Sequence, residues 1–276
     1  MKLYRTASEI FLETEGQFFS LGDLDWDELI NSEDLQGEIE FARRPGAVSS
    51  FSANDRRILA PVESQDIWAA GVTYFRSRTA RMEESDEAGG GDFYDRVYDA
   101  DRPELFPKSS PHRVVGHGTN IRLRADASWS VPEPELVALV NSTGKIIGYT
   151  IGNDVSSRDI EGENPLYLPQ AKIWDGSCAL GPCVLLSSDP LPKDSSVALE
   201  IIRGDETAFE GAATLEQMKR TVEDLVEYLY RECSFPTGCF LMTGTGTVPP
   251  NDFTLESGDS VRISIDGIGT LQNTVE

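Results

Sequence analysis

The sequence predicts a β-rich α+β protein in two parts, a small N-terminal α/β unit over residues 1–62 and a larger unit over residues 63–276. The longest apolar runs are five or six residues and are bounded by turn residues, which is typical of buried strands. One segment late in the chain combines a helix-capping pattern with helical apolar spacing. A chain of 276 residues can bury one sizeable core and still carry a small appended unit.

The N-terminal unit alternates polar and apolar residues irregularly and contains acidic turns such as Ser32-Glu33-Asp34. Pro61 marks its end, because proline interrupts regular structure. No residue pattern in this unit indicates chemistry. We therefore predict an interaction or scaffolding role for it.

A core strand is predicted at residues 67–74, where it ends in the hydroxyl groups of Thr73 and Tyr74. The polar excursion that follows, residues 76–101, contains three consecutive glycines at 89–91. Such a hinge suits a lid over an active site, and a plain flexible surface loop explains it equally well.

The central feature is an acidic strand end followed by a hairpin. Glu133 and Glu135 precede an apolar run at residues 136–140, and the prolines on both sides of Glu133 keep the segment extended. The spacing of two residues places both carboxylates on the same face of an extended chain. Turn residues then lead into a second apolar run at 146–151, which predicts an antiparallel hairpin.

The register of this hairpin predicts where a third carboxylate lies. We expect Val140 to pair with Ile146. Glu133 then faces Asn153, and Asp154 lands next to both glutamates, since neighbouring strands are about 4.8 Å apart. Clustered carboxylates repel one another unless a cation lies among them, and hard oxygen ligands favour Mg²⁺ or Mn²⁺ over Zn²⁺. A solvated acidic strand end in a generally acidic chain explains the same spacing equally well.

Lys172 stands out in a lysine-poor chain. It is one of six lysines, and it adjoins the apolar residues Ile173 and Trp174. A partly desolvated lysine beside a divalent cation can lose its proton and act as a base. The alternative is a snorkelling or salt-bridged lysine. The scarcity of lysine favours the functional interpretation.

The remaining C-terminal elements are predicted to form core. Thr214-Leu215-Glu216-Gln217 is a capping box that opens a helix with a buried stripe extending to Leu229. Core strands are expected at 178–187 and 197–203. The loop 243–250 has a Gly-x-Gly element but lacks the lysine and helix of a phosphate-binding loop, and its hydroxyl and N–H groups could hold a carboxylate.

Neither the histidines nor the cysteines indicate a zinc site. His112 and His117 are five residues apart, which is not the spacing of a metal-binding pair on a helix, so both are predicted to be structural hydrogen-bonding residues. The cysteines lack Cys-x-x-Cys spacing and are expected to be reduced thiols; they are Cys178, Cys183, Cys233 and Cys239.

Charge and composition exclude several classes of function. The 47 acidic and 24 basic residues give a formal net charge of −23, which disfavours nucleic acid and anionic membranes as partners. No apolar run is long enough to span a membrane, and the N-terminus lacks the apolar segment of a signal peptide, so we expect a cytoplasmic protein. Scarce lysine on so acidic a chain is typical of halophilic proteins, whose self-repulsion salt screens.

Several of these motifs occur together in one order: Glu133-x-Glu135, the segment 153–159 that contains Asp154, Lys172, and Thr243-Gly244-Thr245. As a set they resemble the fumarylacetoacetate hydrolase family, over about residues 63–276. Within that family the chain is most similar to archaeal 2-keto-3-deoxy-sugar-acid dehydratases. The segments behind this finer assignment are 102–106, 115–118 and 163–170.

The resemblance implies a mixed β-roll domain, homo-oligomers such as dimers or tetramers, and Mg²⁺, with Mn²⁺ as the alternative, on Glu133, Glu135 and Asp154. No candidate is evident for the His–Glu pair that activates water in the hydrolase members, which argues against simple hydrolysis of a C–C bond. Two features depart from the family pattern. Thr73 stands where a serine is expected, and the surface is far more acidic.

The resemblance further implies a dehydratase in pentose catabolism. Its substrate would be a 2-keto-3-deoxy pentonate, such as the arabinonate or xylonate, and its product 2-oxoglutarate semialdehyde. Lys172 is assigned to deprotonation of C3 or stabilisation of the enolate, and Glu104 is the second acid/base candidate. Thr73 and Thr245 are expected to orient the carboxylate and hydroxyl groups of the substrate.

Two alternatives stay open. One is a Mg²⁺-dependent acylpyruvate hydrolase or oxaloacetate decarboxylase of the same family, which would share the metal but break a C–C bond. The other is a catalytically silent oligomeric binding protein. A product assay separates the first alternative from a dehydratase, and metal titration with a keto-acid screen tests the second.

Overall fold

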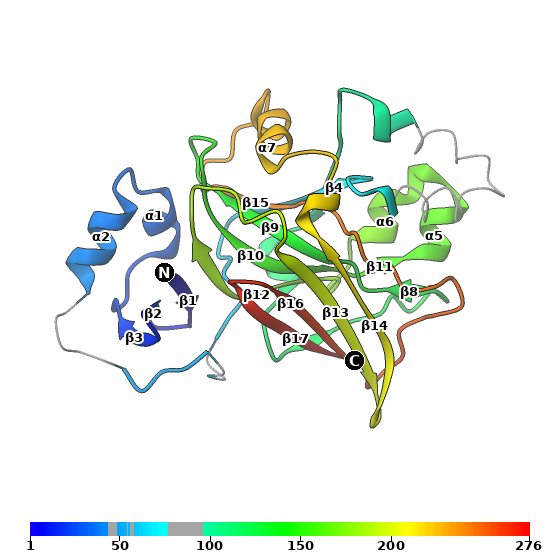
Figure 1. Cartoon of the computed structure of the whole chain (residues 1–276), viewed down its shortest axis with the longest axis horizontal. Helices are drawn as coiled ribbons and strands as arrows, with labels where there is room; N and C mark the ends of the chain where they lie inside the picture. The colour runs from blue at the N-terminus through cyan, green and yellow to red at the C-terminus, as the bar shows by residue number, and fades with distance from the viewer. Residues whose placement is uncertain (44–48, 54, 56–57, 77–95) are drawn as a thin grey trace.

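The computed structural model describes residues 1–43, 49–53, 55, 58–76 and 96–276. Two large β-sheets face each other, and short helices lie around them (Figure 1). This β-rich α+β architecture is the predicted fold class. Most of the predicted lid, at residues 77–95, lies outside the described residues. Within the described ranges, no helix has both the length and the apolar character needed to cross a membrane.

The larger sheet has ten strands. In spatial order its main path is β3 (Gln17–Ser20), β2 (Ile10–Thr14), β1 (Lys2–Arg5), β12 (Cys178–Leu186), β10 (Ile146–Asp154), β9 (Pro134–Val140), β15 (Cys239–Met242), β4 (Asp66–Gly71) and β5 (Glu104–Ser109). The tenth strand, β6 (Val114–Val115), pairs with β12 off this path. The β9–β10 hairpin therefore lies in the middle of the sheet, where both strands are buried.

The other described elements are a second sheet, a two-stranded ladder and short helices. The second sheet has the order β14 (Glu206–Thr214), β13 (Ser196–Arg203), β16 (Ser260–Ile265), β17 (Gly269–Val275) and β7 (Asn120–Ile121). A short ladder joins β11 (Ser156–Ser157) to β8 (Ser130–Val131). Among the described residues, the helices include α1 (Trp26–Asn31), α2 (Leu35–Ala42), α5 (Arg158–Glu163), α6 (Leu168–Lys172) and α7 (Val222–Tyr230), with 3-10 turns η1 (Pro111–Arg113), η2 (Pro165–Tyr167) and η3 (Leu215–Gln217).

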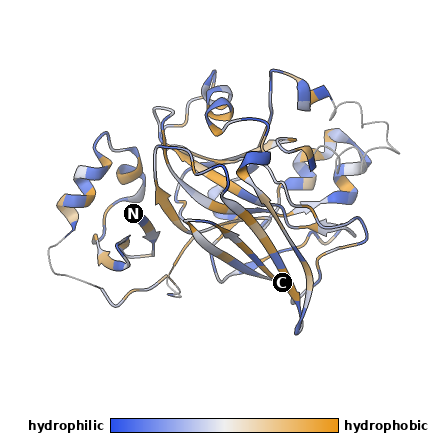
Figure 2. Ribbon diagram, viewed as in Figure 1, coloured by the Kyte–Doolittle hydropathy of each residue, from blue (hydrophilic) through white to orange (hydrophobic). Residues whose placement is uncertain are grey.

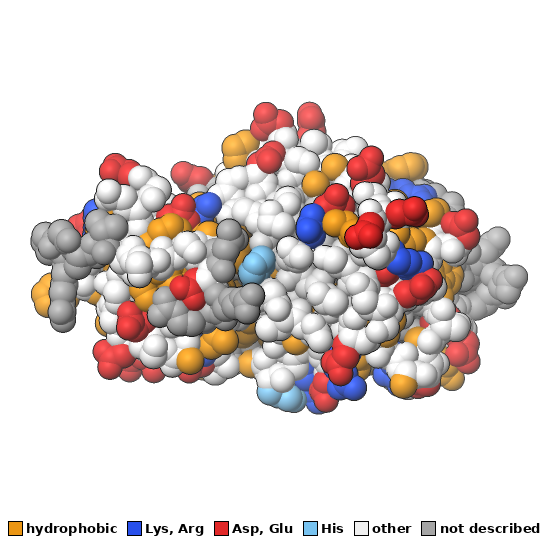
Figure 3. Space-filling model, turned by 90° about the horizontal axis from the view of Figure 1, so that it is seen from below, with side chains coloured by type: hydrophobic (Ala, Val, Ile, Leu, Met, Phe, Trp, Pro, Cys, Tyr) orange, Lys and Arg blue, Asp and Glu red, His pale blue; other side chains and the backbone are white. Residues whose placement is uncertain are grey.

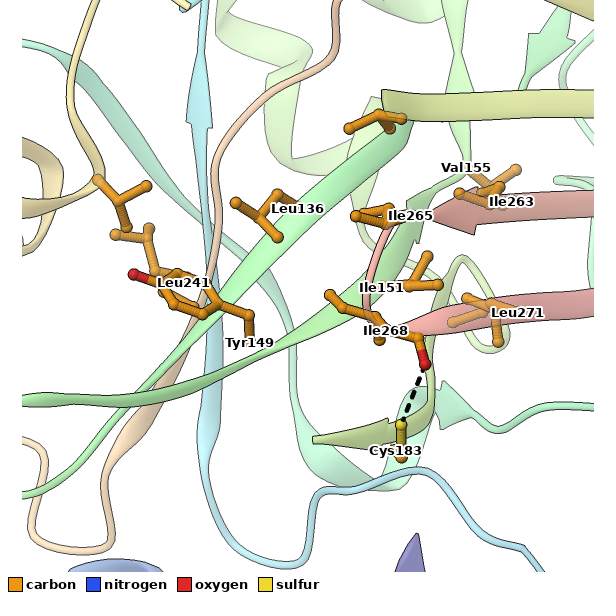
Figure 4. Close-up of a cluster of buried hydrophobic side chains, with 14 of the residues drawn as sticks. Leu136, Tyr149, Ile151, Val155, Cys183, Leu241, Ile263, Ile265, Ile268 and Leu271 are labelled. Carbon is orange, nitrogen blue, oxygen red and sulfur yellow. Dashed lines mark hydrogen bonds between the residues drawn. The ribbon is translucent and has the colours of Figure 1, made fainter. Parts of the chain in front are cut away.

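The main core fills the space between the facing sheets. Leu136 of β9 and Ile151 of β10 lie in one buried cluster with Ile263 and Ile265 of β16 (Figure 4). Hydrophobic residues follow the strands of both sheets, whereas the peripheral helices carry mixed faces (Figure 2). Each fully buried side chain of this size contributes about 1.5–3 kcal/mol, so the cluster holds the hairpin rigidly between the layers.

The N-terminal unit continues the large sheet. Strand β1 pairs antiparallel with β12, with Leu3 opposite Val184. Phe11 stacks on Phe51 with their ring centroids 4.0 Å apart, which packs the unit internally. The acidic turn predicted at Ser32-Glu33-Asp34 joins α1 to α2. A domain boundary at residue 62 stays a prediction.

The predicted hairpin forms, but its register differs from the prediction. Ile146 pairs with Val140 as expected, and a β-bulge before Gly148 then shifts the partners by one residue. Pro134, and not Glu133, is therefore opposite Asn153. The prediction that Glu133 faces Asn153 is wrong because an extra residue in one strand changes every later partner.

The bulge brings two of the acids directly together. Glu133 and Asp154 exchange backbone hydrogen bonds, with N···O distances of 3.2 and 3.0 Å. A bulge cannot be seen in a pattern of apolar runs, because it leaves their lengths and composition unchanged. The predicted neighbourhood of the carboxylates is nevertheless correct.

The predicted start of the long helix is also wrong. The capping box at Thr214 opens only the 3-10 turn η3, and α7 begins at Val222 with Thr221 as its N-cap. Between them Met218 has extended backbone and forms a β-bridge with Tyr74. Tertiary pairing therefore interrupts a segment whose local pattern is helical throughout.

Candidate active site

The three predicted carboxylates converge at the end of the β9–β10 hairpin. Glu133, Glu135 and Asp154 each present an oxygen, and these oxygens lie within 4.8 Å of one another. The side chains are buried, with relative exposures of 5%, 2% and 1%. A solvated acidic strand end is therefore excluded, because such an end would leave these groups in water.

Lys172 reaches this cluster from the last residue of α6. Its Nζ donates to Glu133 Oε2 at 2.7 Å and lies 3.2 Å from Asp154 Oδ2. It also donates to the Ser156 hydroxyl oxygen at 2.5 Å. The side chain is completely buried, so its charge is balanced within the protein.

Lys108 is a second buried lysine at the site, and sequence reasoning missed it. It extends from β5, and its Nζ lies 2.5 Å from Asp154 Oδ1. It also donates to the carbonyl oxygens of Val155 at 3.0 Å and of Lys172 at 2.5 Å. The scarcity that drew attention to Lys172 applies equally to Lys108, and it was the available signal.

Arg158, the first residue of α5, adds a third buried cation. Its Nη2 donates to Glu133 Oε1 at 3.0 Å, and its Nε lies 4.0 Å from Glu161 Oε2. Glu161 Oε1 lies 3.9 Å from Lys172 Nζ. Figure 1 shows α5 and α6 packed beside each other next to the β8–β11 ladder, which explains how they deliver these groups together.

The electrostatics of the cluster favour an additional cation. Burial, together with the charges of Asp154 and Glu133, raises the pKa of Glu135 well above its ordinary value. Burial alone would also raise the pKa of Asp154, but Lys108 and Lys172 outweigh it and hold that pKa below its ordinary value. With every group ionised, the buried acids Glu133, Glu135, Asp154 and Glu161 would outnumber the buried bases Lys108, Arg158 and Lys172 by one charge. A cation bound beside Glu135 would offset the repulsion that raises its pKa.

Gly244 holds one of the three carboxylates, that of Glu135, in place. Its backbone N–H donates to Glu135 Oε2 at 2.5 Å, and its φ is +88°. A Cβ at this position would collide with the Thr73 hydroxyl, so glycine is required for steric as well as conformational reasons. The predicted loop thus does hold a carboxylate, and that carboxylate belongs to the protein's own Glu135.

Of the two threonines predicted to orient the substrate, only Thr245 lines the cavity next to the carboxylates. Thr245 lines the cavity, and its hydroxyl donates to the carbonyl oxygen of Thr247 at 3.0 Å. Thr73 is fully buried behind Gly244 and does not line the cavity. Its hydroxyl donates to the carbonyl oxygen of Thr243 at 2.6 Å. The geometry thus gives Thr73 a structural contact in the loop that holds Glu135.

Glu104 is the first residue of β5, which β15 and β4 separate from β9 in the large sheet. It pairs with Gly71 across β4 and β5, and its side chain occupies the space that a Cβ on Gly71 would need. Gly71 lines the cavity and Glu104 does not.

Val72, the residue after Gly71, has a φ of +54°. This conformation is strained for a β-branched side chain, and such strain clusters at functional sites. The cavity is lined by Ala70, Gly71, Val72, Phe106, Glu133, Glu135, Asp154, Arg158, Lys172, Gly244 and Thr245.

The donor set fits a hard divalent cation. Three carboxylate oxygens from rigid elements meet in one buried place, which suits Mg²⁺ or Mn²⁺ better than Zn²⁺. Lys172 Nζ contacts Glu133 Oε2 and Asp154 Oδ2. These two carboxylates thus already bind one positive group of the protein, which shows that their oxygens are arranged to hold positive charge.

The histidines and cysteines lie outside this cluster. His117 Nδ1 accepts a hydrogen bond from the backbone N–H of Gln272 at 3.2 Å, which agrees with a structural role. Burial lowers the pKa of His117 from its ordinary value. All four cysteines are free thiols.

Comparison with known proteins gives the same family as the sequence motifs. Residues 79–276 match the family model described as fumarylacetoacetate (FAA) hydrolase C-terminal. The chain is 49% identical over 222 residues to a Haloferax volcanii protein named "Probable 2-keto-3-deoxyxylonate dehydratase", covering 80% of this chain and 75% of that protein. It is 44% identical over 232 residues to the 2-dehydro-3-deoxy-D-arabinonate dehydratase of Saccharolobus solfataricus, covering 83% and 78%.

Solved structures agree. A structure of 2-keto-3-deoxy-D-arabinonate dehydratase complexed with magnesium and 2,5-dioxopentanoate superposes with a TM-score of 0.85 and 37% identity, covering 100% of this chain and 99% of that one. A fumarylacetoacetate hydrolase from Exiguobacterium antarcticum superposes with a TM-score of 0.71 and 25% identity, covering 100% and 99%. With the model match extending over most of the chain, this protein belongs to the fumarylacetoacetate hydrolase family.

Proposed function

We propose that this protein is a magnesium-dependent dehydratase of a 2-keto-3-deoxy pentonate and that it forms 2,5-dioxopentanoate, which is 2-oxoglutarate semialdehyde, in pentose catabolism. The observation that carries the proposal is the buried set of three carboxylates with Lys172 directly against it. The dehydratase relatives at 44% and 49% identity support the reaction class. The solved dehydratase that contains magnesium and 2,5-dioxopentanoate supports both the cofactor and the product.

Glu133, Glu135 and Asp154 would hold the metal. When bound, magnesium supplies a Lewis acid that polarises the keto group of the substrate and acidifies its C3 protons. Glu133 and Asp154 are held by the strand pairing, and Glu135 by Gly244. Such a preorganised site does not have to rearrange during the reaction.

Lys172 takes the C3 proton in this proposal, as the neutral amine that it becomes when a divalent cation binds at the same carboxylates. Its Nζ lies beside the carboxylates, so it faces any substrate held there. Glu104 is the candidate that protonates the leaving C4 hydroxyl group, which departs as water and leaves a C3=C4 double bond. The C5 carbon then loses a proton and C3 regains one, and the enol so formed tautomerises to the C5 aldehyde of the product. The Glu104 carboxylate lies against Gly71, which lines the cavity, in the space that a Cβ on Gly71 would need. Thr245 lines the cavity and is the candidate to orient the substrate, with Thr73 supporting the loop behind it.

A product assay tests the proposal. The protein is incubated with 2-keto-3-deoxy-arabinonate, -xylonate or -gluconate, with magnesium or with a chelator, and the semialdehyde is measured. We expect a pentonate to lose one water in a magnesium-dependent reaction. Release of pyruvate or carbon dioxide would instead indicate hydrolase or decarboxylase chemistry. No turnover of any keto acid would indicate a silent binding protein.

We further propose a halophilic, cytoplasmic homo-oligomer. The charge of −23 and the six lysines support adaptation to salt, as does the similarity to a Haloferax volcanii protein. Acidic side chains are scattered over the face shown in Figure 3 and are not gathered in one patch. Light scattering in molar KCl tests the assembly, with a dimer or tetramer as the expected result.

A further inference from the structure

We propose that Lys108 is a positioning residue that reserves one oxygen of Asp154 for the metal, and that it thereby favours Mg²⁺ over larger cations. The inference rests on the proposed metal site. It concerns a side chain that neither the family motifs nor the comparisons assign.

Each carboxylate of the cluster has one oxygen bound by a fixed donor of the protein. Arg158 Nη2 donates to Glu133 Oε1 at 3.0 Å. The backbone N–H of Gly244 donates to Glu135 Oε2 at 2.5 Å. The third donor is Lys108, which contacts Asp154. Each of the three carboxylates thus has its own donor, and the three donors come from different parts of the chain.

The Asp154 carboxylate shows this division most clearly. Lys108 Nζ lies 2.5 Å from Oδ1, and the Ser156 hydroxyl reaches the same oxygen at 3.4 Å. Lys172 Nζ lies 3.2 Å from Oδ2, and the same ammonium group lies 2.7 Å from Glu133 Oε2. The two oxygens that share Lys172 are therefore the ones turned away from Lys108 and Arg158.

Lys108 is held too firmly to be a mobile acid or base. Its side chain has no exposed surface, and its Nζ also donates to the carbonyl oxygens of Val155 and Lys172. The Lys172 carbonyl accepts a second hydrogen bond from the Ser177 hydroxyl at 3.0 Å. Lys108 thus ties Asp154 to the end of α6, from which the Lys172 side chain extends.

This arrangement has a consequence for ion selectivity. Three carboxylates that each give one oxygen leave half of an octahedral shell for a chelating substrate and water. Mg²⁺ demands that near-octahedral shell, whereas Ca²⁺ takes six to eight oxygens and readily binds carboxylates through both atoms. Lys108 lies 2.5 Å from Asp154 Oδ1 and is also tied to two carbonyl oxygens, whereas the Lys172 contact with Oδ2 is longer, at 3.2 Å. Asp154 therefore offers an ion Oδ2 and not both oxygens.

The test is a comparison of ion binding in Lys108→Met and in the matched control Lys193→Met, since Lys193 is exposed. Mg²⁺ and Ca²⁺ affinities are measured by calorimetry without substrate. We expect Lys108→Met to lose Mg²⁺ affinity by about 10–100-fold, the usual cost of removing an outer-shell partner. We expect a smaller loss for Ca²⁺, so that the Ca²⁺/Mg²⁺ affinity ratio rises at least several-fold. Lys108→Arg, which keeps a donor, should restore part of the preference.

Equal losses for the two ions in Lys108→Met, or a falling ratio, would overturn the inference. Because that variant can fail to fold, a crystal of the wild-type protein soaked in Mn²⁺ gives an independent result. We expect Asp154 to bind the ion through Oδ2 alone with Lys108 still on Oδ1. Bidentate binding by Asp154 would refute the role of Lys108 and leave the proposed function intact. Failure of the wild type to bind any divalent ion would overturn both.

Discussion

At the scale of single residues, the site is an arrangement of buried charges that are mutually satisfied. Lys172 is fully buried and contacts Glu133, Asp154 and Ser156. Removing one partner of such a cluster leaves an uncompensated charge, which is strongly destabilising. A variant of Lys172 can therefore lose activity for a structural or a catalytic reason, and measuring both turnover and Mg²⁺ affinity distinguishes the two.

Lys172→Met should abolish turnover without abolishing metal binding. We expect turnover to fall by about 10²–10⁴-fold, the usual contribution of a positioned general base. The affinity for Mg²⁺ should stay the same or increase, since a competing positive charge has been removed. Semialdehyde formation and calorimetry measure the two effects. The exposed Lys145→Met is the control, and full activity in Lys172→Met would remove Lys172 from the scheme.

At this scale the sequence predicted the three carboxylates of the site but not all of its buried lysines. The composition and spacing of Glu133, Glu135 and Asp154 predicted their convergence correctly. Lys108 was missed, although it is as scarce and as buried as Lys172. No motif of adjacent residues marks Lys108, because its contact with Asp154 is created entirely by the packing of β5 against the site.

At the scale of elements, the β9–β10 hairpin sets the geometry of the acids. Its bulge before Gly148 determines that Glu133, and not Pro132, pairs with Asp154. Gly148 also packs against β12, where a Cβ would lie 2.6 Å from the Leu185 carbonyl oxygen. That contact is with backbone and cannot be relieved by a rotamer change.

Gly148→Ala should therefore destabilise the fold. We expect a loss of about 1–3 kcal/mol in the free energy of unfolding, as is usual for overpacking a buried site. Urea titration followed by fluorescence measures it. Lys145→Ala, exposed in the same hairpin, should change stability by less than about 0.5 kcal/mol. Equal stability of the two variants would show that β10 can move away from β12 freely.

The segment that leads into α7 shows how tertiary contacts change a predicted helix. The local pattern at residues 214–229 is helical throughout, yet the chain forms η3, an extended bridge at Met218, and then α7. The bridge to Tyr74 and the backbone hydrogen bond from Lys219 N–H to the Thr73 carbonyl oxygen, at 3.0 Å, tie this segment to the residues that follow Val72, which lines the cavity. Long-range pairing here overrides a favourable local propensity.

At the scale of the whole molecule, the proposed metal site should contribute to stability. An ion that binds only the folded state stabilises it by about 2.7 kcal/mol when its concentration is 100 times its dissociation constant. We therefore expect Mg²⁺ to raise the midpoint of thermal unfolding in the wild type. Asp154→Asn should remove this increment, since it removes a charged ligand. A calorimetric scan measures both, and an equal increment in Asp154→Asn would exclude Asp154 as a ligand.

The net charge of −23 predicts a second global property. Self-repulsion of the folded chain is long-ranged at low salt and is screened within about 3 Å at 1 M. We expect the unfolding midpoint to rise when KCl is increased from physiological to molar concentration. Sucrose of equal osmolality is the control for water activity. A midpoint that follows sucrose as closely as KCl would show that charge screening is not the cause.

The sequence by itself determined the strands, the hairpin and the pairing of acids two residues apart, because these depend on the periodicity of neighbouring residues. Only the tertiary structure decided the rest. Glu135 meets the Gly244 N–H from 109 residues away, and Lys172 meets Glu133 across 39 residues. Contacts over such distances are fixed by how the sheets and helices pack together. That packing depends on many residues at once and leaves no local pattern to read.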